Sequence, residues 1–184
     1  MSLRVIGGRF RSRRLKSVPG VVVRPTPDRL RETLFNVLAA RLEGTIFLDA
    51  YAGSGAVGIE ALSRGARHVI LIERNAQALS VIRENLRSLE IDKEATVVRG
   101  TAATWLRNYK PDIAFIDPPY EQVKEYSTSL LALSEAGCLV VIAQHASRTV
   151  LENHYGAMEK TRVLKQGDNS LSFFEYAAER STTE

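Results

Sequence analysis

Cysteine, histidine and long apolar runs are scarce in this sequence. The one cysteine, Cys138, excludes an intramolecular disulfide, and its place inside an apolar run favours a buried structural thiol. Three widely spaced histidines give no constellation of metal ligands, so no metal is expected. No run approaches the ~18–20 apolar residues of a membrane span, and the N-terminal region lacks the apolar core of a signal peptide. We therefore expect a cytoplasmic protein without a membrane segment.

The size of the chain is that of one globular domain, and its charge is unevenly distributed. With 184 residues it can bury roughly 70% of its unfolded surface, so it needs no disulfide or metal for stability. Residues 1–31 hold nine basic residues and one acid, whereas the remainder carries a net charge of −4. A basic end on a near-neutral body predicts an arm that binds a polyanion, although a solvated basic tail has the same composition.

The basic segment also carries an apolar pattern. Short apolar residues alternate with arginines on either side of Gly7-Gly8, which predicts a small basic β-hairpin. Residues 21–23 then read as a further short strand. Thr26 is a good helix N-cap with Pro27 at the first helical position. The helix that follows carries an apolar stripe at helical spacing, formed by Leu30, Leu34, Val37, Leu38 and Leu42.

Strands and helices alternate over the rest of the chain. Buried strands are predicted at residues 45–49, 68–72, 95–99, 112–117 and 137–144, and a closing hairpin at 159–165 and 170–178. Helices lie between the first five strands, and a short helix is predicted at 147–154. This alternation predicts a parallel sheet covered on both faces. The last strand follows a hairpin turn, so it should be antiparallel to the rest.

The sharpest motif is Asp117-Pro118-Pro119-Tyr120, directly after an apolar strand. The two prolines cannot donate ladder hydrogen bonds, so they end the strand in a rigid turn. A carboxylate, free carbonyls and an aromatic ring are then left at the carboxyl end of a strand, where open α/β sheets bind ligands. Asp117 and the Pro118 carbonyl can accept the N–H bonds of a planar amino group, and Tyr120 can stack on its ring. An ordinary strand-ending turn is the alternative interpretation of these four residues.

A second motif, Gly53-x-Gly55-x-x-Gly58, lies between a strand and a helix. Such a turn lets a ligand approach the backbone at a helix N-terminus. Glu73 follows the strand-ending Asp49 by 24 residues, about the spacing at which an acid binds ribose hydroxyls. The pattern also fits a dinucleotide, but the acidic Asp49 suits a pyrophosphate poorly and a cationic sulfonium cofactor well. An NAD-dependent dehydrogenase is therefore the weakest alternative.

Several segments together carry a family resemblance. They are Arg4-Val5-Ile6-Gly7-Gly8, Arg24-Pro25-Thr26, Arg31-Glu32, Phe35-Asn36, Ala52-Gly53-Ser54-Gly55, Gly58-Ile59-Glu60-Ala61, Asp117-Pro118-Pro119-Tyr120 and Gly167-Asp168. On these segments, which span nearly the whole chain, it resembles the class I S-adenosylmethionine-dependent methyltransferases. More narrowly it resembles the RsmD-type bacterial enzymes, which methylate a guanine N2 in small-subunit (16S) ribosomal RNA. Each segment alone is unspecific, whereas their combination is specific.

The resemblance implies a fold, a cofactor and a partner. The fold is α/β and Rossmann-like, with a seven-stranded, mostly parallel sheet of strand order 3-2-1-4-5-7-6 whose last strand is antiparallel. Residues 1–23 would form a hairpin arm that binds RNA, and residues 24–184 the methyltransferase domain. S-adenosylmethionine is the implied cofactor, and small-subunit ribosomal RNA or the assembling small subunit the implied partner. A monomer needs no further assumption.

The resemblance also implies roles for residues. The target base would be held by Asp117, Pro118, Pro119 and Tyr120. The cofactor would be bound by Asp49, Tyr51, Ala52, Gly53, Ser54, Gly55, Glu73, Arg74, Thr101, Ala102 and Asp117. The RNA would be contacted by Arg4, Arg9, Arg11, Arg13, Arg14, Lys16, Arg29, Arg31 and Asn36. Thr101 stands where the family usually has an Asp that contacts the adenine amino group, so this contact would come from Thr101 or from the Ala102 backbone, or would be lost. Direct in-line methyl transfer is expected, with Asp117 a candidate proton acceptor.

Other activities share these motifs. Asp-Pro-Pro-Tyr also occurs in enzymes that methylate adenine N6 in DNA or RNA, and a related Asn-Pro-Pro-Tyr in enzymes that methylate glutamine in proteins. The motif therefore indicates a planar amino acceptor without saying which one. No obvious DNA target-recognition domain is present, which disfavours sequence-specific DNA modification. A catalytically silent RNA-binding module of the same fold is the alternative from another class. The sequence does not identify the target nucleotide.

Overall fold

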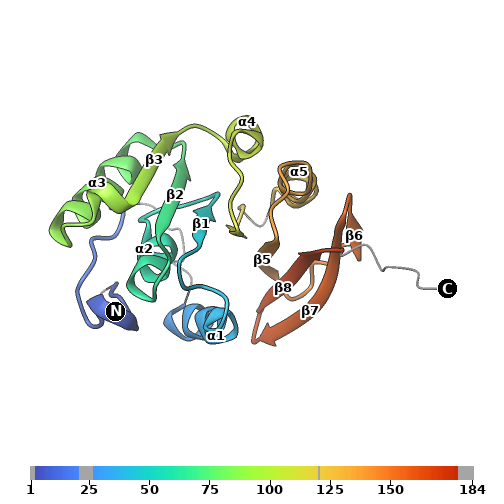
Figure 1. Ribbon diagram of the computed structural model, residues 1–184, viewed down its shortest axis with the longest axis horizontal. Coiled ribbons are helices and arrows are strands. Elements are labelled where there is room, and N and C mark those ends of the chain that lie inside the picture. Colours follow the sequence, from blue (N-terminus) through green and yellow to red (C-terminus); the bar gives the residue numbers. More distant parts are fainter. Residues whose placement is uncertain (1–2, 21–26, 120, 178–184) are drawn as a thin grey trace.

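The chain forms a single sheet with helices on both faces (Figure 1). The computed structural model describes residues 3–20, 27–119 and 121–177. The strands are β1 (Ile46–Asp49), β2 (His68–Glu73), β3 (Ala95–Arg99), β4 (Ile113–Ile116), β5 (Val140–Ala146), β6 (His154–Tyr155), β7 (Met158–Gln166) and β8 (Asn169–Tyr176). The α-helices are α1 (Asp28–Leu38), α2 (Ala56–Ser63), α3 (Ala76–Ser88), α4 (Ala102–Trp105) and α5 (Val123–Glu135). Short 3-10 turns cover Gly8–Phe10, Asp92–Glu94 and Leu106–Asn108.

The sheet has the order β3-β2-β1-β4-β5-β8-β7-β6. The first five are parallel neighbours, and β8 pairs antiparallel with β5. The seven predicted strands thus take the predicted order, and the antiparallel last strand is confirmed. The prediction of seven strands is wrong by one, because β6 adds a two-residue eighth strand at the β7 edge.

The predicted helix at residues 147–154 is also wrong. The Ser147 N–H donates to the Asp168 carbonyl (2.9 Å) and its hydroxyl to the Gly167 carbonyl (3.0 Å). These bonds hold the chain in a turn against the β7–β8 hairpin, and residues 154–155 then pair with β7. Local propensity is overridden here by long-range hydrogen bonds that periodicity does not reveal.

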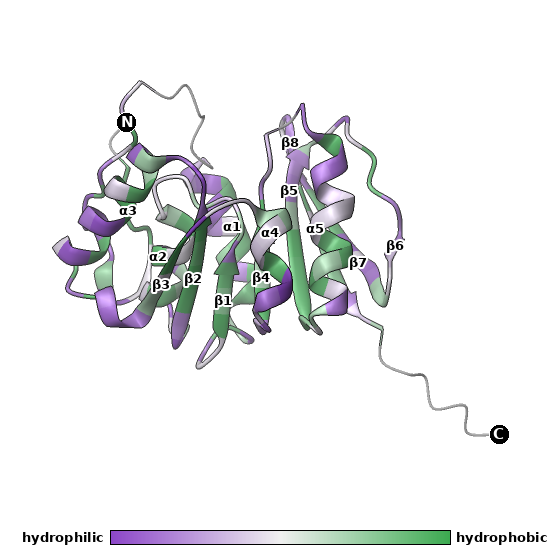
Figure 2. Ribbon diagram, turned by 90° about the horizontal axis from the view of Figure 1, so that it is seen from above, coloured by the Kyte–Doolittle hydropathy of each residue, from purple (hydrophilic) through white to green (hydrophobic). Residues whose placement is uncertain are grey.

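Two apolar layers enclose the sheet. One packs α1, α2, α3 and the N-terminal segment on one face, and the other packs α4 and α5 on the opposite face. Consecutive strand residues alternate between them: Phe47 belongs to the first layer and Leu48 to the second. Because both faces are covered, the strands are nearly continuous apolar runs. Figure 2 shows them as a mostly hydrophobic layer, with hydrophilic residues on the helices around it.

The N-terminal segment pairs with itself as predicted but without regular strands. Arg4 and Arg14 form an isolated antiparallel bridge, flanked by Val5 N–H to the Arg13 carbonyl (2.9 Å) and Leu15 N–H to the Leu3 carbonyl (2.9 Å). The turn needs glycine at position 8, where φ is +74° and an added Cβ would lie 1.8 Å from the Ser63 carbonyl oxygen. Leu3, Val5 and Leu15 are buried in the first apolar layer, so this segment is part of the domain core.

Glu60 of α2 joins the N-terminal segment to the helices. Its side chain is 0% exposed and accepts the Ile6 N–H (2.8 Å), the Gly7 N–H (2.8 Å) and the Arg64 Nε–H (2.7 Å). The Arg31 Nε atom lies 3.9 Å from the same carboxylate. One buried carboxylate therefore satisfies two backbone donors and balances two guanidinium groups.

The buried position of Arg31 corrects a predicted role. Its side chain is 1% exposed, and its Nη2 donates to the Arg4 carbonyl (2.6 Å) and to Asp28 Oδ1 (3.0 Å). Burial lowers the pKa of Arg31, although Glu60 and Asp28 counteract this effect. Arg31 is therefore unavailable to an RNA in this structure, and its contacts hold α1 against the N-terminal segment.

The start of α1 differs from the expected cap. The helix begins at Asp28 with Pro27 as the N-cap residue, one position later than predicted. The predicted cap Thr26 and the predicted strand at 21–23 lie outside the described residues. Over the described part of the chain, the helices are too short or too polar to cross a membrane.

The Glu60 contacts predict a large loss of stability on truncation. In Glu60→Ala two backbone donors and the buried Arg31 lose their partner, so we expect the free energy of unfolding to fall by about 3–5 kcal/mol. Urea denaturation measures this loss. The control is Glu135→Ala, because its pair with Arg107 is exposed on both sides and should contribute at most about 1 kcal/mol. Equal losses in the two variants would contradict the assigned role of Glu60.

Candidate active site

Three carboxylates gather at the carboxyl ends of β2, β1 and β4, as the sequence predicts. Asp49 ends β1 and is opposite Leu71 on β2 and Phe115 on β4. Glu73 and Asp117 come two residues later on these flanking strands. Because adjacent strands lie about 5 Å apart, the three side chains share one edge of the sheet. Asp49 lies between the other two.

Burial, together with neighbouring carboxylates, raises the pKa values of Asp49 and Asp117. Burial raises the pKa of Asp49 to about 7, and Glu73 adds to the rise, while the Tyr51 N–H opposes it by donating to Oδ1 at 3.3 Å. Burial raises the pKa of Asp117 to about 8, and the neighbouring Asp49 contributes. Without a bound cation the pair therefore favours protonation near neutral pH. A positively charged ligand would favour the ionised forms.

The glycine turn after β1 is open toward a ligand. Gly53 has φ +54° with nothing within 4 Å of an added Cβ, and Gly55 has φ +81°. The Gly53 N–H donates to Glu73 Oε2 (2.8 Å), and Glu73 Oε1 accepts the Asn75 N–H (2.8 Å). Glu73 thus fixes the turn against the end of β2. At Gly58 an added Cβ would lie 2.4 Å from Leu71 Cδ2, so this glycine lets α2 pack closely on the sheet.

The remaining predicted cofactor residues occupy different surroundings. The Tyr51 hydroxyl donates to Glu125 Oε2 (2.8 Å) and lies 3.0 Å from Ser129 Oγ, both on α5. Burial raises the pKa of Tyr51. Thr101 is the N-cap of α4, with its hydroxyl 2.9 Å from Thr104 Oγ1, and Ala102 is buried behind it. Arg74 is exposed.

The turn after β4 is described up to its second proline. Pro118 is buried, Pro119 is exposed, and the Pro119 carbonyl accepts the Gln122 N–H (2.8 Å). This bond leads the chain into α5. Tyr120 lies outside the described residues, so its predicted stacking role stays a prediction.

The tip of the basic N-terminal segment lies away from the carboxylates. Arg9 pairs with Glu94, just before β3, and the Phe10 N–H donates to Ser63 Oγ at the end of α2 (2.9 Å). Arg13 Nη2 donates to the carbonyl of Ser88, the last residue of α3 (2.9 Å). Helices α2 and α3 begin at the carboxyl edge of the sheet, so their C-terminal ends lie at its amino edge. These three partners therefore lie near the amino ends of the parallel strands. The segment's turn is therefore bound to the opposite edge of the sheet.

The other predicted RNA-binding residues fall into two groups. Arg4 pairs with Asp28 (3.7 Å) and Lys16 with Glu84 (2.8 Å). A second set has no ion-pair partner within the described ranges and is exposed, namely Arg11, Arg14, Arg29 and Asn36. Five of the nine predicted RNA-binding residues, with Arg9, Arg13 and Arg31 included, thus have a partner within the domain.

Sequence reasoning missed two buried amides near the site. Asn85 of α3 donates from Nδ2 to the carbonyls of Ser54 (3.0 Å) and Lys16 (3.0 Å) and accepts the Lys16 N–H (2.7 Å). It therefore ties the N-terminal segment to the glycine turn. Gln144 of β5 is the second, at 2% exposure. In the sequence, each of these amides is a polar residue within an apolar pattern. This pattern could have drawn attention to them, but it does not show which groups they contact.

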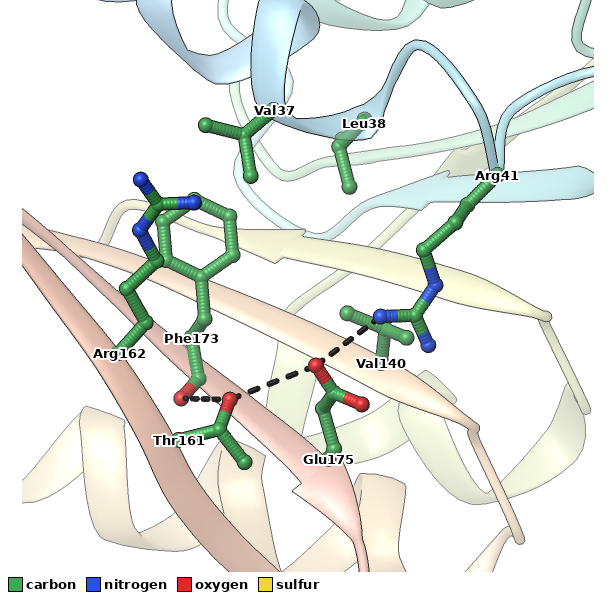
Figure 3. Close-up of a pocket in the computed structure, with 8 residues that line it drawn as sticks. All are labelled: Val37, Leu38, Arg41, Val140, Thr161, Arg162, Phe173 and Glu175. Atoms are coloured by element: carbon green, nitrogen blue, oxygen red, sulfur yellow. Dashed lines mark hydrogen bonds and ion pairs between the residues drawn. The ribbon is translucent and has the colours of Figure 1, made fainter.

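A cavity of about 320 Å³ lies elsewhere, between α1 and strands β5, β7 and β8 (Figure 3). Arg41 Nη1 donates to Glu175 Oε1 across it (2.9 Å), and the Thr161 hydroxyl lies 3.4 Å from the same atom. Glu175 pairs with Val140 at the amino end of β5. This cavity is therefore at the edge of the sheet opposite the carboxylates and is separate from the predicted site.

The raised pKa values predict a pH-dependent stability of the cofactor-free protein. The folded chain keeps protons on Asp49 and Asp117 up to about pH 7 and 8, while ordinary carboxyl groups release theirs near pH 4. The free energy of unfolding should therefore fall as pH rises through this window, by about 1.4 kcal/mol per pH unit for each such group. Urea denaturation from pH 5 to 8 should give a flatter profile for Asp117→Asn than for the unsubstituted protein. Parallel profiles would contradict these pKa values.

Comparison with known proteins identifies relatives along the whole chain. "Putative rRNA methyltransferase YlbH" of Bacillus subtilis is 35% identical over 182 residues, covering 94% of this chain and 98% of the relative. Ribosomal RNA small subunit methyltransferase D of Escherichia coli is 41% identical over 122 residues, which is 65% of this chain and 61% of the relative. The solved structure of Escherichia coli YhhF is 31% identical with a TM-score of 0.85, covering 97% of this chain and 100% of that chain.

A family profile gives the same result. The family described as conserved hypothetical protein 95 matches residues 3–175, which include the N-terminal segment, all three carboxylates and the closing hairpin. The strand order, the open glycine turn and the acidic carboxyl edge are those expected of a methyltransferase that uses S-adenosylmethionine. The chain therefore belongs to this family, the RsmD-type S-adenosylmethionine-dependent methyltransferases.

Proposed function

We propose that this protein methylates the exocyclic N2 amino group of a guanine in small-subunit ribosomal RNA. The observation that carries the proposal is the buried Asp49 and the half-buried Asp117 at the ends of neighbouring strands, beside an open glycine turn. Its support from relatives is the enzyme named ribosomal RNA small subunit methyltransferase D, 41% identical over 122 residues. The proposed partner is the ribosomal RNA or the assembling small subunit, and the proposed place of action is the cytoplasm.

The residues present fit a cationic nucleoside cofactor. Gly53 leaves open space at the turn, while Asp49 and Glu73 supply carboxylates on either side of it. Asp49 would balance the sulfonium charge, and Glu73 would accept the ribose hydroxyls. Charge-assisted hydrogen bonds of this kind contribute roughly 1.5–3 kcal/mol each. When bound, S-adenosylmethionine supplies a methyl group activated by its sulfonium. Tyr51, Ala52, Ser54, Gly55, Arg74, Thr101 and Ala102 complete the proposed cofactor-binding set.

Asp117 is the proposed base-binding and proton-accepting group. As a carboxylate it accepts an N–H of the amino group, and it stabilises the positive charge that develops on the nitrogen during methylation. With the cationic cofactor bound, Asp117 would be ionised and would then accept the proton that the amino group releases. The Pro118 carbonyl is the proposed second acceptor, with Pro119 and Tyr120 shaping the pocket.

In-line methyl transfer needs no covalent enzyme intermediate, and Cys138 is poorly placed to form one. The sole cysteine, Cys138, is buried on the α5 side of the sheet, and burial raises its pKa to about 12. Positioning and electrostatics are therefore the proposed sources of rate acceleration.

The direct test compares three methyl acceptors. Purified protein is incubated with labelled S-adenosylmethionine and undermethylated small ribosomal subunits, naked ribosomal RNA or duplex DNA, and the products are digested to nucleosides. Label in N2-methylguanosine from ribosomal RNA is the expected outcome. Label in N6-methyladenine would overturn the proposed acceptor, and cofactor binding without transfer to any substrate would favour a silent binding module.

Two substitutions should separate base binding from cofactor binding. Asp117→Ala should lower kcat by roughly 10²-fold or more, because the developing charge loses its acceptor. It should bind S-adenosylhomocysteine in calorimetry as the unsubstituted protein does. Glu73→Ala should instead raise the Kd for the cofactor roughly 10- to 100-fold, as lost charge-assisted bonds require. Near-normal turnover of Asp117→Ala would refute its assignment.

Arg14 and Arg29 are exposed and have no ion-pair partner among the described residues, so they should carry the RNA contact. Arg14→Gln and Arg29→Gln should each reduce the slope of log affinity against log salt by about 0.7, the value for one phosphate of a single strand. Arg9→Gln is the matched control, since Arg9 is paired with Glu94 at the opposite edge. The affinity of each variant for ribosomal RNA is measured by filter binding between about 50 and 200 mM salt, and the slopes of the variants are compared. An equal change in all three variants would argue against a defined contact surface.

A further inference from the structure

Gln144 is a buried amide whose oxygen has no partner. Its side chain is 2% exposed, and Oε1 makes no hydrogen bond to any described residue. An amide atom left unpaired in a protein interior is costly, and native structures usually provide a partner. Gln144 also lies near the carboxyl end of β5, two residues before the strand ends at Ala146. Its position therefore calls for a partner that arrives from outside the chain.

The register of the sheet places Gln144 beside Asp117. Ile116 of β4 pairs with Ala143 of β5, so the next residues along the two parallel strands are Asp117 and Gln144. Neighbouring strands are about 5 Å apart. Gln144 thus lies one strand beyond Asp117, on the side away from the glycine turn, because β1 adjoins β4 on the other side.

Both side chains lie on the same face of the sheet. Along β5, Val140 and Ile142 belong to the apolar layer of α1, whereas Val141 and Ala143 belong to the layer of α5. This alternation puts Gln144 on the α1 face, and His145 accordingly packs against Tyr126 of α5. Phe115 of β4 belongs to the α1 layer, and Asp117, two residues later, therefore lies on the same face of the sheet. Asp49 is on this face as well, two residues after Phe47.

The backbone of Gln144 is firmly held. The Tyr126 hydroxyl donates to the Gln144 carbonyl (2.8 Å) from the opposite face, and the residue pairs with Leu171 of β8. The side chain of a residue fixed in this way starts from a defined point, as a group that reads a ligand must. Its unpaired oxygen is therefore not a consequence of a loose strand.

From this juxtaposition we propose that Gln144 is a specificity-determining residue that reads the ring N1 position of the target base. The inference rests on the proposed function, in which Asp117 accepts the exocyclic amino group. In guanine the N1–H group is adjacent to the N2 amino group, so it can donate to Gln144 Oε1 while the amino group donates to Asp117. Two acceptors on neighbouring strands thus match two adjacent donors on one purine edge.

The same arrangement disfavours adenine. With its N6 amino group at Asp117, adenine presents N1 as an acceptor, and two acceptors would face each other. A site with an acceptor for a substrate's hydrogen-bond donor strongly rejects an analogue that lacks this donor. An apolar pocket discriminates much less between ligands of slightly different shape. Gln144 thereby supplies the discrimination between purines that Asp117-Pro118-Pro119-Tyr120 leaves open.

Two variants test this role. Gln144→Leu removes the acceptor and should lower kcat/KM for ribosomal RNA about 10- to 100-fold, the range for loss of a specific base contact. Gln144→Glu keeps an oxygen acceptor and should retain most of the activity on guanine. Binding of S-adenosylhomocysteine, measured by calorimetry, should be the same in both variants and in the unsubstituted protein. Urea denaturation confirms that each variant is folded.

A base analogue distinguishes recognition of the base by Gln144 from a purely structural role of this residue. An RNA carrying 2-aminopurine at the mapped target keeps the 2-amino group but has no hydrogen on N1. The unsubstituted protein should prefer guanine over 2-aminopurine by about 10-fold or more, and Gln144→Leu should lose this preference. A purely structural role for Gln144 would change activity on both substrates equally.

The outcomes distinguish this inference from the proposed function. If the unsubstituted protein transfers no methyl group to guanine, the proposed function fails and the inference fails with it. If it does transfer, but Gln144→Leu keeps full kcat/KM and the same preference for guanine, the inference alone is overturned.

Discussion

The burial of carboxyl groups at the carboxyl edge of the sheet is the constraint on which the site depends. Burial is the main cause of the raised pKa of Asp49 and of Asp117, and the charge of Asp49 raises the pKa of Asp117 further. The proposed function places a cation and an amino group at this edge, where they would offset that cost. The glycine turn on one side has open space, and the Gln144 oxygen on the other side has no hydrogen-bond partner in the part of the chain that the structure describes. The carboxyl edge of the sheet is thus left incomplete, while apolar layers cover both faces of the sheet behind it.

Glu60 has the opposite role, because it completes the part of the structure that supports this edge. It is buried in the helix that starts at the glycine turn, and it binds the N-terminal segment and α1 together. Asn85 makes a second connection, from Lys16 to the carbonyl of Ser54. The N-terminal segment is therefore a support for the cofactor turn as well as a source of positive charge. Any RNA that displaces its ion pairs acts on a segment that touches the cofactor turn directly.

Particular elements show how far sequence reasoning extends. Apolar periodicity places the central strands correctly, because each strand is buried on both faces, whereas their order comes from the family resemblance. The turns have their own glycine, proline or cap, as with Asn75, which accepts the Gln77 and Ala78 N–H groups. It fails at residues 147–154, where bonds to the distant β7–β8 hairpin decide the conformation. Charge composition identifies the basic N-terminal segment, but it does not show which acidic groups its arginines and lysine contact. Arg31 and Arg29 look equivalent in the sequence, yet one is buried against Glu60 and the other is exposed.

The sequence by itself determined the family, the parallel sheet and the three carboxylates at its carboxyl edge. These depend on local patterns: apolar runs, glycine and proline turns, and acids placed directly after strands. Only the tertiary structure decided which charges are paired, which are buried and which side chains meet across strands. Asp117 and Gln144 are 27 positions apart in the chain, and the register of β4 against β5 alone makes them neighbours. Strand register is set by packing over the whole sheet, so no local pattern encodes that contact.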